Sequence, residues 1–146
     1  MNAYMNQYHQ NQVATASPEQ ILIMLYDGAL RFLGQAASGI ENGDRELRTR
    51  YINKTIAIIS ELSATLNHEI GGQVSANLAD LYDYMIRELM SANAQNDLQP
   101  LRGVEKLLGE LRETWMQAIE INRQEVAGVS ANVPSEPGKK HLATAY

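Results

Sequence analysis

Four segments of this chain repeat apolar residues at intervals of three and four, the spacing that places side chains on one face of an α-helix. No segment shows the alternation of apolar and polar residues that is typical of a strand. The expected helices cover about 18–41, 45–68, 74–94 and 98–122. Because they have similar lengths and short connections, the sequence predicts an all-α fold, an antiparallel four-helix bundle.

Local signals mark several of the expected helix ends. Ser17, Pro18 and Gln20 match an N-cap, a first helical residue and the reciprocal partner of a capping box. Gly43 is the expected stop of the first helix, and Asp44 is the expected N-cap of the second. The Gly71-Gly72 pair is the expected end of the second helix.

The two ends of the chain lack this regular pattern. Residues 1–16 are polar apart from a few apolar positions that include Tyr4, Tyr8 and Val13, and we expect them to form a short capping helix or segment only by docking. From about residue 125 the apolar pattern stops and Gly, Pro and Lys follow, which predicts a disordered tail. The expected organisation is therefore a helical domain over 1–124, including the cap, and a flexible tail over 125–146.

The first helix carries more apolar surface than a bundle position normally buries. One stripe contains Leu22, Leu25, Ala29, Phe32 and Ala36, and the other contains Ile23, Tyr26, Leu30, Leu33, Ala37 and Ile40. A bundle helix normally buries one stripe, and an exposed second stripe would form an apolar surface patch of the kind that marks a binding site. Two interpretations follow. Either the other helices or the tail cover the second stripe, or it lines an open groove for a partner helix.

Composition and residue spacing exclude or disfavour several classes of function. A net charge of −5 argues against a nucleic-acid or anionic-membrane surface, and the absence of Cys excludes disulfides and thiolate sites. None of the three histidines, His9, His68 and His141, has a Glu three residues before it, so no metal site of the Glu-x-x-His type is expected. No phosphate loop or catalytic constellation is evident. We expect no cofactor, no metal and no enzymatic activity.

The sequence also predicts where the protein is located. The chain does not begin with a signal peptide, and its longest apolar run, 21–26, is far shorter than the roughly 20 residues of a membrane helix, so a cytoplasmic location is expected.

Tyr26, Tyr51 and Tyr82 could each pack in the bundle or line an interface. Tyr84 falls on the polar side of its helix and is expected to be exposed, as tyrosines at interfaces are.

The run from Thr15 to Ala29, TASPEQILIMLYDGA, closely resembles the signature of the FliS family of flagellin export chaperones. Weaker matches follow in order, and they include Asn2-Ala3-Tyr4, the isoleucine-rich stretch 52–62, the stretch 77–97 and Trp115. The resemblance covers about residues 2–120. After about Asn122 the chain matches nothing in the family pattern, which leaves the role of the tail open.

The resemblance implies a cytoplasmic helical bundle that binds the C-terminal segment of newly made flagellin and prevents its early polymerisation. The chaperone–flagellin complex is then delivered to the type III flagellar export gate, whose platform protein is FlhA. No nucleotide or metal is implied. The groove residues that we expect on this basis are Ile23, Tyr26, Leu30, Leu33, Ile56, Tyr82 and Tyr84. Tyr4, Tyr8 and Val13 are expected to form a cap that covers part of the groove and moves when flagellin binds.

A second hypothesis stands beside this one. The chain could be a bundle that associates with itself, with the second stripe buried in a homodimer, and that binds another export-related partner. A helical enzyme would need a cleft with a strongly perturbed acid or base, and no residue pattern indicates one.

Overall fold

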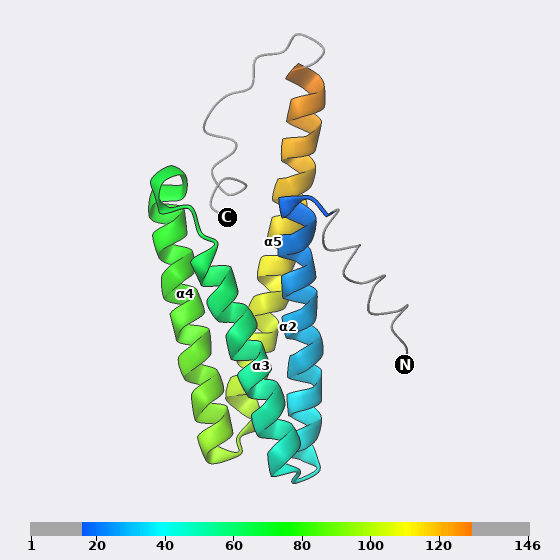
Figure 1. The fold of residues 1–146 in the computed structure, drawn as a ribbon, viewed down its shortest axis with the longest axis vertical. Coiled ribbons are helices and arrows are strands. Elements are labelled where there is room, and N and C mark those ends of the chain that lie inside the picture. Colours follow the sequence, from blue (N-terminus) through cyan, green and yellow to red (C-terminus); the bar gives the residue numbers. More distant parts are fainter. Residues whose placement is uncertain (1–15, 130–146) are drawn as a thin grey trace.

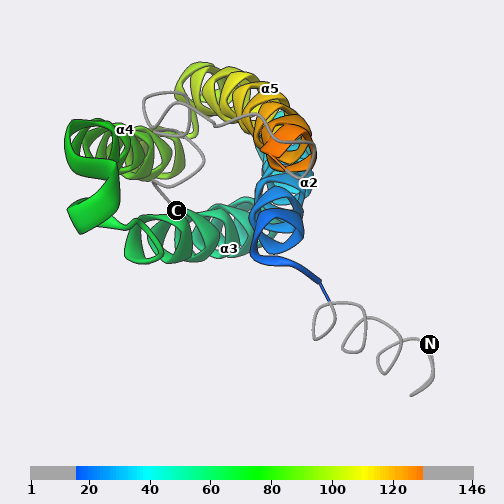
Figure 2. The ribbon, with the colours of Figure 1, turned by 90° about the horizontal axis from the view of Figure 1, so that it is seen from above.

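The computed structural model describes residues 16–129, and these residues form four α-helices and no strand. The helices are α2 (Pro18–Glu41), α3 (Arg45–Ala64), α4 (His68–Gln95) and α5 (Leu98–Val129). Consecutive helices run antiparallel, and α5 closes the bundle against α2 (Figures 1 and 2). The predicted antiparallel four-helix bundle is confirmed. The expected capping segment, apart from Ala16, and the tail beyond residue 129 lie outside the described residues.

The start of α2 follows the predicted capping box. The Gln20 backbone N–H donates to Ser17 Oγ at 3.2 Å, and the Ser17 backbone N–H donates to Gln20 Oε1 at 2.9 Å. The turn after α2 contains Gly43 at φ +69°, and Asp44 caps α3 by accepting from the Leu47 backbone N–H at 3.0 Å. These predicted boundaries are confirmed because capping depends only on neighbouring residues.

The boundary between α3 and α4 differs from the prediction. α3 ends at Ala64, and Asn67 caps α4 by accepting from the Ile70 backbone N–H at 3.0 Å. Gly71-Gly72 therefore does not end a helix. Gly72, at φ +52° and ψ −121°, instead kinks α4 near its start, and Ser75 Oγ donates to the Asn67 carbonyl at 2.9 Å across the kink. The Asn67 side chain is the N-cap of α4. This cap was not predicted, because the Gly71-Gly72 pair indicated a helix end at a later position.

α5 is longer than predicted. It was expected to end near residue 122 but continues to Val129, so the expected domain boundary at 124/125 falls within this helix. Arg123 makes two hydrogen bonds to the Glu120 carboxylate three residues earlier, at 2.8 and 3.1 Å, and Gln124 adds a third at 3.1 Å. These pairs support the helix where its apolar pattern weakens. The last turns of α5 extend beyond the start of α2 (Figure 1).

The position of α2 accounts for its broad apolar face. α2 packs against α3 on one side and α5 on the other, as the view from above shows (Figure 2). From the predicted second stripe, Tyr26, Leu33 and Ala37 are buried, whereas Ile23, Leu30 and Ile40 are half-buried against the core. Most of that stripe is therefore covered by neighbouring helices in this structure.

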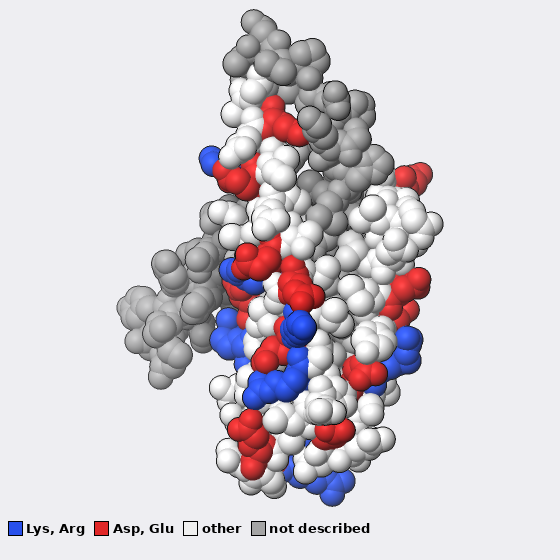
Figure 3. Space-filling view, turned by 180° about the vertical axis from the view of Figure 1, so that it is seen from behind, with Lys and Arg blue, Asp and Glu red and all other residues white. Residues whose placement is uncertain are grey.

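Charged side chains of both signs are interspersed on the surface. On the face seen from behind, Lys and Arg lie among Asp and Glu without separating into large areas of one sign (Figure 3). At the end of the bundle where α2 meets α3, Arg48 donates to Asn93 at 2.9 Å and to Asn96 at 2.7 Å, which ties α3 to α4. Exposed ion pairs such as Arg50–Glu46 add little to stability. None of the described helices is both long and apolar enough to span a membrane.

Candidate partner-binding surface

Three aromatic side chains from three helices meet inside the bundle. The hydroxyls of Tyr26 from α2 and Tyr82 from α4 lie 2.5 Å apart, and Trp115 from α5 donates its Nε1–H to the Tyr26 hydroxyl at 3.0 Å. All three side chains are almost fully buried. Because a buried polar group without a partner is costly, this network favours one relative position of the three helices.

This network does not provide an acid or base near neutral pH. Burial raises the pKa of the Tyr26 hydroxyl far above its ordinary value, and the nearby Tyr82 raises it further. Burial also raises the pKa of Tyr82. Both tyrosines therefore stay neutral at pH values where a cell operates. The network links α2, α4 and α5 inside the bundle.

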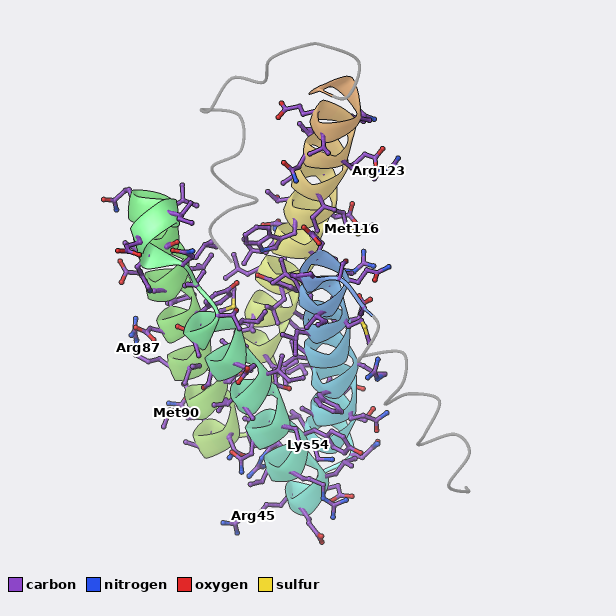
Figure 4. The ribbon with its side chains drawn as sticks, turned by 45° about the horizontal axis from the view of Figure 1, so that its top comes forward. Arg45, Lys54, Arg87, Met90, Met116 and Arg123 are labelled. Carbon is purple, nitrogen blue, oxygen red and sulfur yellow. The ribbon has the colours of Figure 1, made fainter. Side chains whose placement is uncertain are left out.

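An apolar groove lies where the first turns of α2 run beside α5. We call it the α5-side groove, and it is lined by Ala16, Glu19, Gln20, Ile23, Met24, Met116 and Ile119. Its volume is about 590 Å³. Met116 lies on α5 beside the start of α2 (Figure 4), and it is 43% exposed. Because Met24 and Met116 are unbranched and adaptable, they suit a surface that must accept varied apolar side chains.

A smaller groove lies on the other edge of α2, towards α3. This α3-side groove has a volume of about 240 Å³, and its apolar lining includes Ile21, Met24, Leu25, Phe32 and Ile58. Met24 lines both grooves and is 36% exposed, so it forms a ridge between them. The two grooves therefore adjoin each other at Met24 along the first half of α2.

The seven predicted groove residues do not form one surface. Ile23 lines the α5-side groove, whereas Leu30 and Ile56 are half-buried against the core. Tyr26, Leu33 and Tyr82 are buried. The role of all seven residues in binding stays a prediction. The three buried residues could contact a partner only after a movement of the helices.

Tyr84 is exposed, as predicted, but lies apart from the other groove residues. Its exposed fraction is 44%, and it lines a separate pocket of about 480 Å³ between α4 and the start of α5. Pro100 and Leu107 lie on the opposite wall of that pocket. The predicted capping residues Tyr4, Tyr8 and Val13 lie outside the described residues.

Sequence reasoning missed the residues that α5 contributes. Met116 and Ile119 complete the α5-side groove, but the groove residues expected from the sequence all belong to the first three helices. A usable signal was present, because Met116 and Ile119 lie at helical spacing immediately beside the core residue Trp115. Their meeting with Ile23 depended on how α5 packs against α2, which the pattern of either helix alone does not specify.

The lining of the grooves is suited to binding an apolar partner. The α5-side groove combines several half-exposed apolar side chains with Glu19 and Gln20 at its rim. Residues 16–129, which the structure describes, contain no group of three or more His, Cys, Asp or Glu side chains placed to hold a metal ion. Arg112 on α5 donates to the Asp27 carboxylate on α2 at 2.5 Å, which raises the pKa of Arg112 and joins the two helices. The fold and the surface thus define a helical-bundle binding protein.

Comparison with known proteins gives the family. The family model described as "Flagellar protein FliS" matches residues 1–122. A "Flagellar secretion chaperone FliS" of Bacillus subtilis is 42% identical over 121 residues, covering 83% of this chain and 90% of that protein. The protein of the same name in Salmonella typhimurium is 42% identical over 118 residues, covering 80% and 87%. The Escherichia coli protein of that name is 31% identical over 111 residues, covering 75% and 82%. The chain belongs to the FliS family.

Proposed function

We propose that this protein is a cytosolic export chaperone that binds the C-terminal segment of flagellin, prevents its premature polymerisation and delivers it to FlhA at the flagellar export gate. The observation that carries the proposal is the α5-side groove. It is formed by Ile23 and Met24, within the family motif Thr15–Ala29, together with Met116 and Ile119 of α5. The names of the relatives, which are flagellar secretion chaperones, support it further.

The chemistry of the groove fits a partner that is unfolded when free. Such a segment loses conformational entropy when it becomes ordered on binding. Burial of apolar side chains along a continuous track offsets that cost, at about 25 cal/mol for each Å² removed from water. Release then requires only that the export machinery compete for the same segment, and no bond has to be broken by the chaperone.

Replacing Ile23 by Asp is expected to weaken binding of the flagellin C-terminal segment by at least about tenfold, because a carboxylate in the groove must lose water without gaining a partner. Ile23 is only half-buried, so the folded bundle should persist. Calorimetric titration of the purified protein with the segment measures the affinity. The matched control is Met90→Asp, because Met90 is 59% exposed and points outward from α4 (Figure 4). Equal affinities for the two folded variants would contradict the assignment of the groove.

We also propose that residues 1–15 cover the α5-side groove when flagellin is absent. Ala16, which directly follows this segment in the chain, lines the groove, and the segment carries the apolar residues Tyr4, Tyr8 and Val13. Deleting residues 1–15 should raise the affinity for a short flagellin peptide severalfold, because the peptide no longer has to displace a tethered competitor. Fluorescence of an apolar dye should also rise. If neither quantity changes, the segment is not a cap.

Self-association is the alternative that these experiments also test. Met24 and Met116 are exposed enough to bury in a homodimer. Sedimentation of the free protein with and without the flagellin segment separates the two functions. A dimer that stays intact while the segment fails to bind would favour the alternative, whereas a dimer that dissociates on addition of the segment would support the chaperone proposal.

A further inference from the structure

Two cationic side chains flank the α3-side groove. The Arg31 guanidinium carbon lies 5.9 Å from the centroid of the Phe32 ring. Lys54 Nζ lies 5.4 Å from the Phe32 centroid and 5.2 Å from the Tyr51 centroid. Lys54 lies on α3 where this helix runs alongside α2 (Figure 4). The two aromatic rings themselves are in contact, with centroids 5.6 Å apart.

Within the part of the chain that the structure describes, no carboxylate forms an ion pair with either of these two cations. This holds although the protein carries 17 acidic residues against 12 basic ones. Residues 1–15 contain no Asp or Glu, and residues 130–146 contain a single acidic side chain, Glu136. A cation–π contact at an exposed site contributes only about 0.5–1 kcal/mol, and it leaves the positive charge available to a carboxylate.

The charge of the groove also changes along its length. Arg31 and Lys54 lie at the end nearer the middle of α2. Glu61, exposed and seven residues after Lys54, falls on the same face of α3 about 10 Å further along the helix axis. Because α2 and α3 are antiparallel, Glu61 lies towards the start of α2. An apolar partner helix would therefore meet positive charge at one end and negative charge at the other.

We propose that the α3-side groove is a second docking site for the partner, and that it takes an amphipathic helix whose carboxylates pair with Arg31 and Lys54. The inference rests on the proposed function, since the occupant is a helix of the bound flagellin segment. Met24 lines both grooves, so one partner chain can pass over it from the α5-side groove to this site. The aromatic rings hold the two cations at the rim before binding, which reduces the entropy lost on pairing. The pairing sets the direction in which the helix lies.

The test is the rate at which the protein associates with the immobilised C-terminal segment of its own organism's flagellin. The variant is Arg31→Glu with Lys54→Glu. The control is Arg87→Glu with Lys106→Glu, which changes the net charge equally on α4 and α5. All four side chains are exposed, so folding should be unaffected, and circular dichroism checks this. At about 0.1 M salt, charges more than about 10 Å from the contact are screened.

We expect the groove variant to associate about tenfold more slowly and to lose most of its salt dependence, because charges at the rim act mainly on association. The control should change by less than about twofold. If both folded variants associate like the wild type, the inference is wrong while the proposed function stands. If the wild type does not bind the segment, both fail. If the groove variant changes only the self-association of the free protein, the occupant is a second copy and the inference is overturned.

Discussion

Replacing Trp115 by Ala is expected to lower the free energy of unfolding by about 3–5 kcal/mol, the usual range for truncating a buried aromatic side chain. Trp115 is 1% exposed and is the only tryptophan in the chain. Its loss removes the ring and the hydrogen bond to the Tyr26 hydroxyl, and the cavity lies where α2, α4 and α5 meet. Urea unfolding followed by circular dichroism measures the effect.

The neighbouring residue provides the control for this substitution. Met116 is 43% exposed and lines the α5-side groove, so Met116→Ala should change the free energy of unfolding by no more than about 0.5 kcal/mol. It should nevertheless weaken binding of the flagellin segment. If Met116→Ala destabilised the protein as much as Trp115→Ala, the different burial of these two side chains would be contradicted.

Replacing Gly39 by Ala is expected to destabilise the protein by about 1–2 kcal/mol, although alanine normally stabilises a helix by about 0.5–1 kcal/mol relative to glycine. A Cβ at Gly39 would lie 2.5 Å from the Arg48 backbone nitrogen and 2.8 Å from the Arg48 Cα. These are backbone atoms of α3, which cannot move away as a flexible side chain can. Urea unfolding followed by the fluorescence of Trp115 reports the change.

Gly34, in the same helix, separates this clash from helix propensity. A Cβ at Gly34 would have no neighbouring atom within 4 Å, and the residue is exposed. Gly34→Ala should therefore stabilise the protein by about 0.5–1 kcal/mol. The two substitutions are expected to have opposite signs. Stabilisation by both would show that α2 and α3 do not approach closely at Gly39.

Local sequence signals predicted most of the architecture. The start of α2 at Pro18 and the start of α3 at Arg45 were correct because Ser17 and Asp44 cap their helices through nearby atoms. The failures arose where two local signals competed. Gly71-Gly72 suggested a helix end, but Asn67 had already started α4, and Gly72 only kinks it. The end of α5 was predicted too early because the apolar pattern fades while side-chain pairs continue the helix.

The candidate binding surface could be predicted only in part. The amphipathic pattern of α2 identified it as the helix with surplus apolar surface, and Ile23 does line a groove. The pattern could not separate Ile23 from Tyr26 or Leu33, because all of them repeat at helical spacing. Their different burial depends on the positions of α3 and α5 around α2. The same applies to Lys54, which lies beside Phe32 only because α3 folds back along α2.

The sequence by itself determined the four helices, their order, the caps at Ser17 and Asp44 and the family, because each of these depends on residues close together in the chain. The tertiary structure decided which apolar side chains became core and which became groove. It placed Tyr26, Tyr82 and Trp115 in one hydrogen-bonded network, although they come from three helices. It also placed Met116 beside Ile23, and Arg31 and Lys54 at one rim. Contacts between helices depend on their relative rotation and packing, which residue spacing within one helix does not encode.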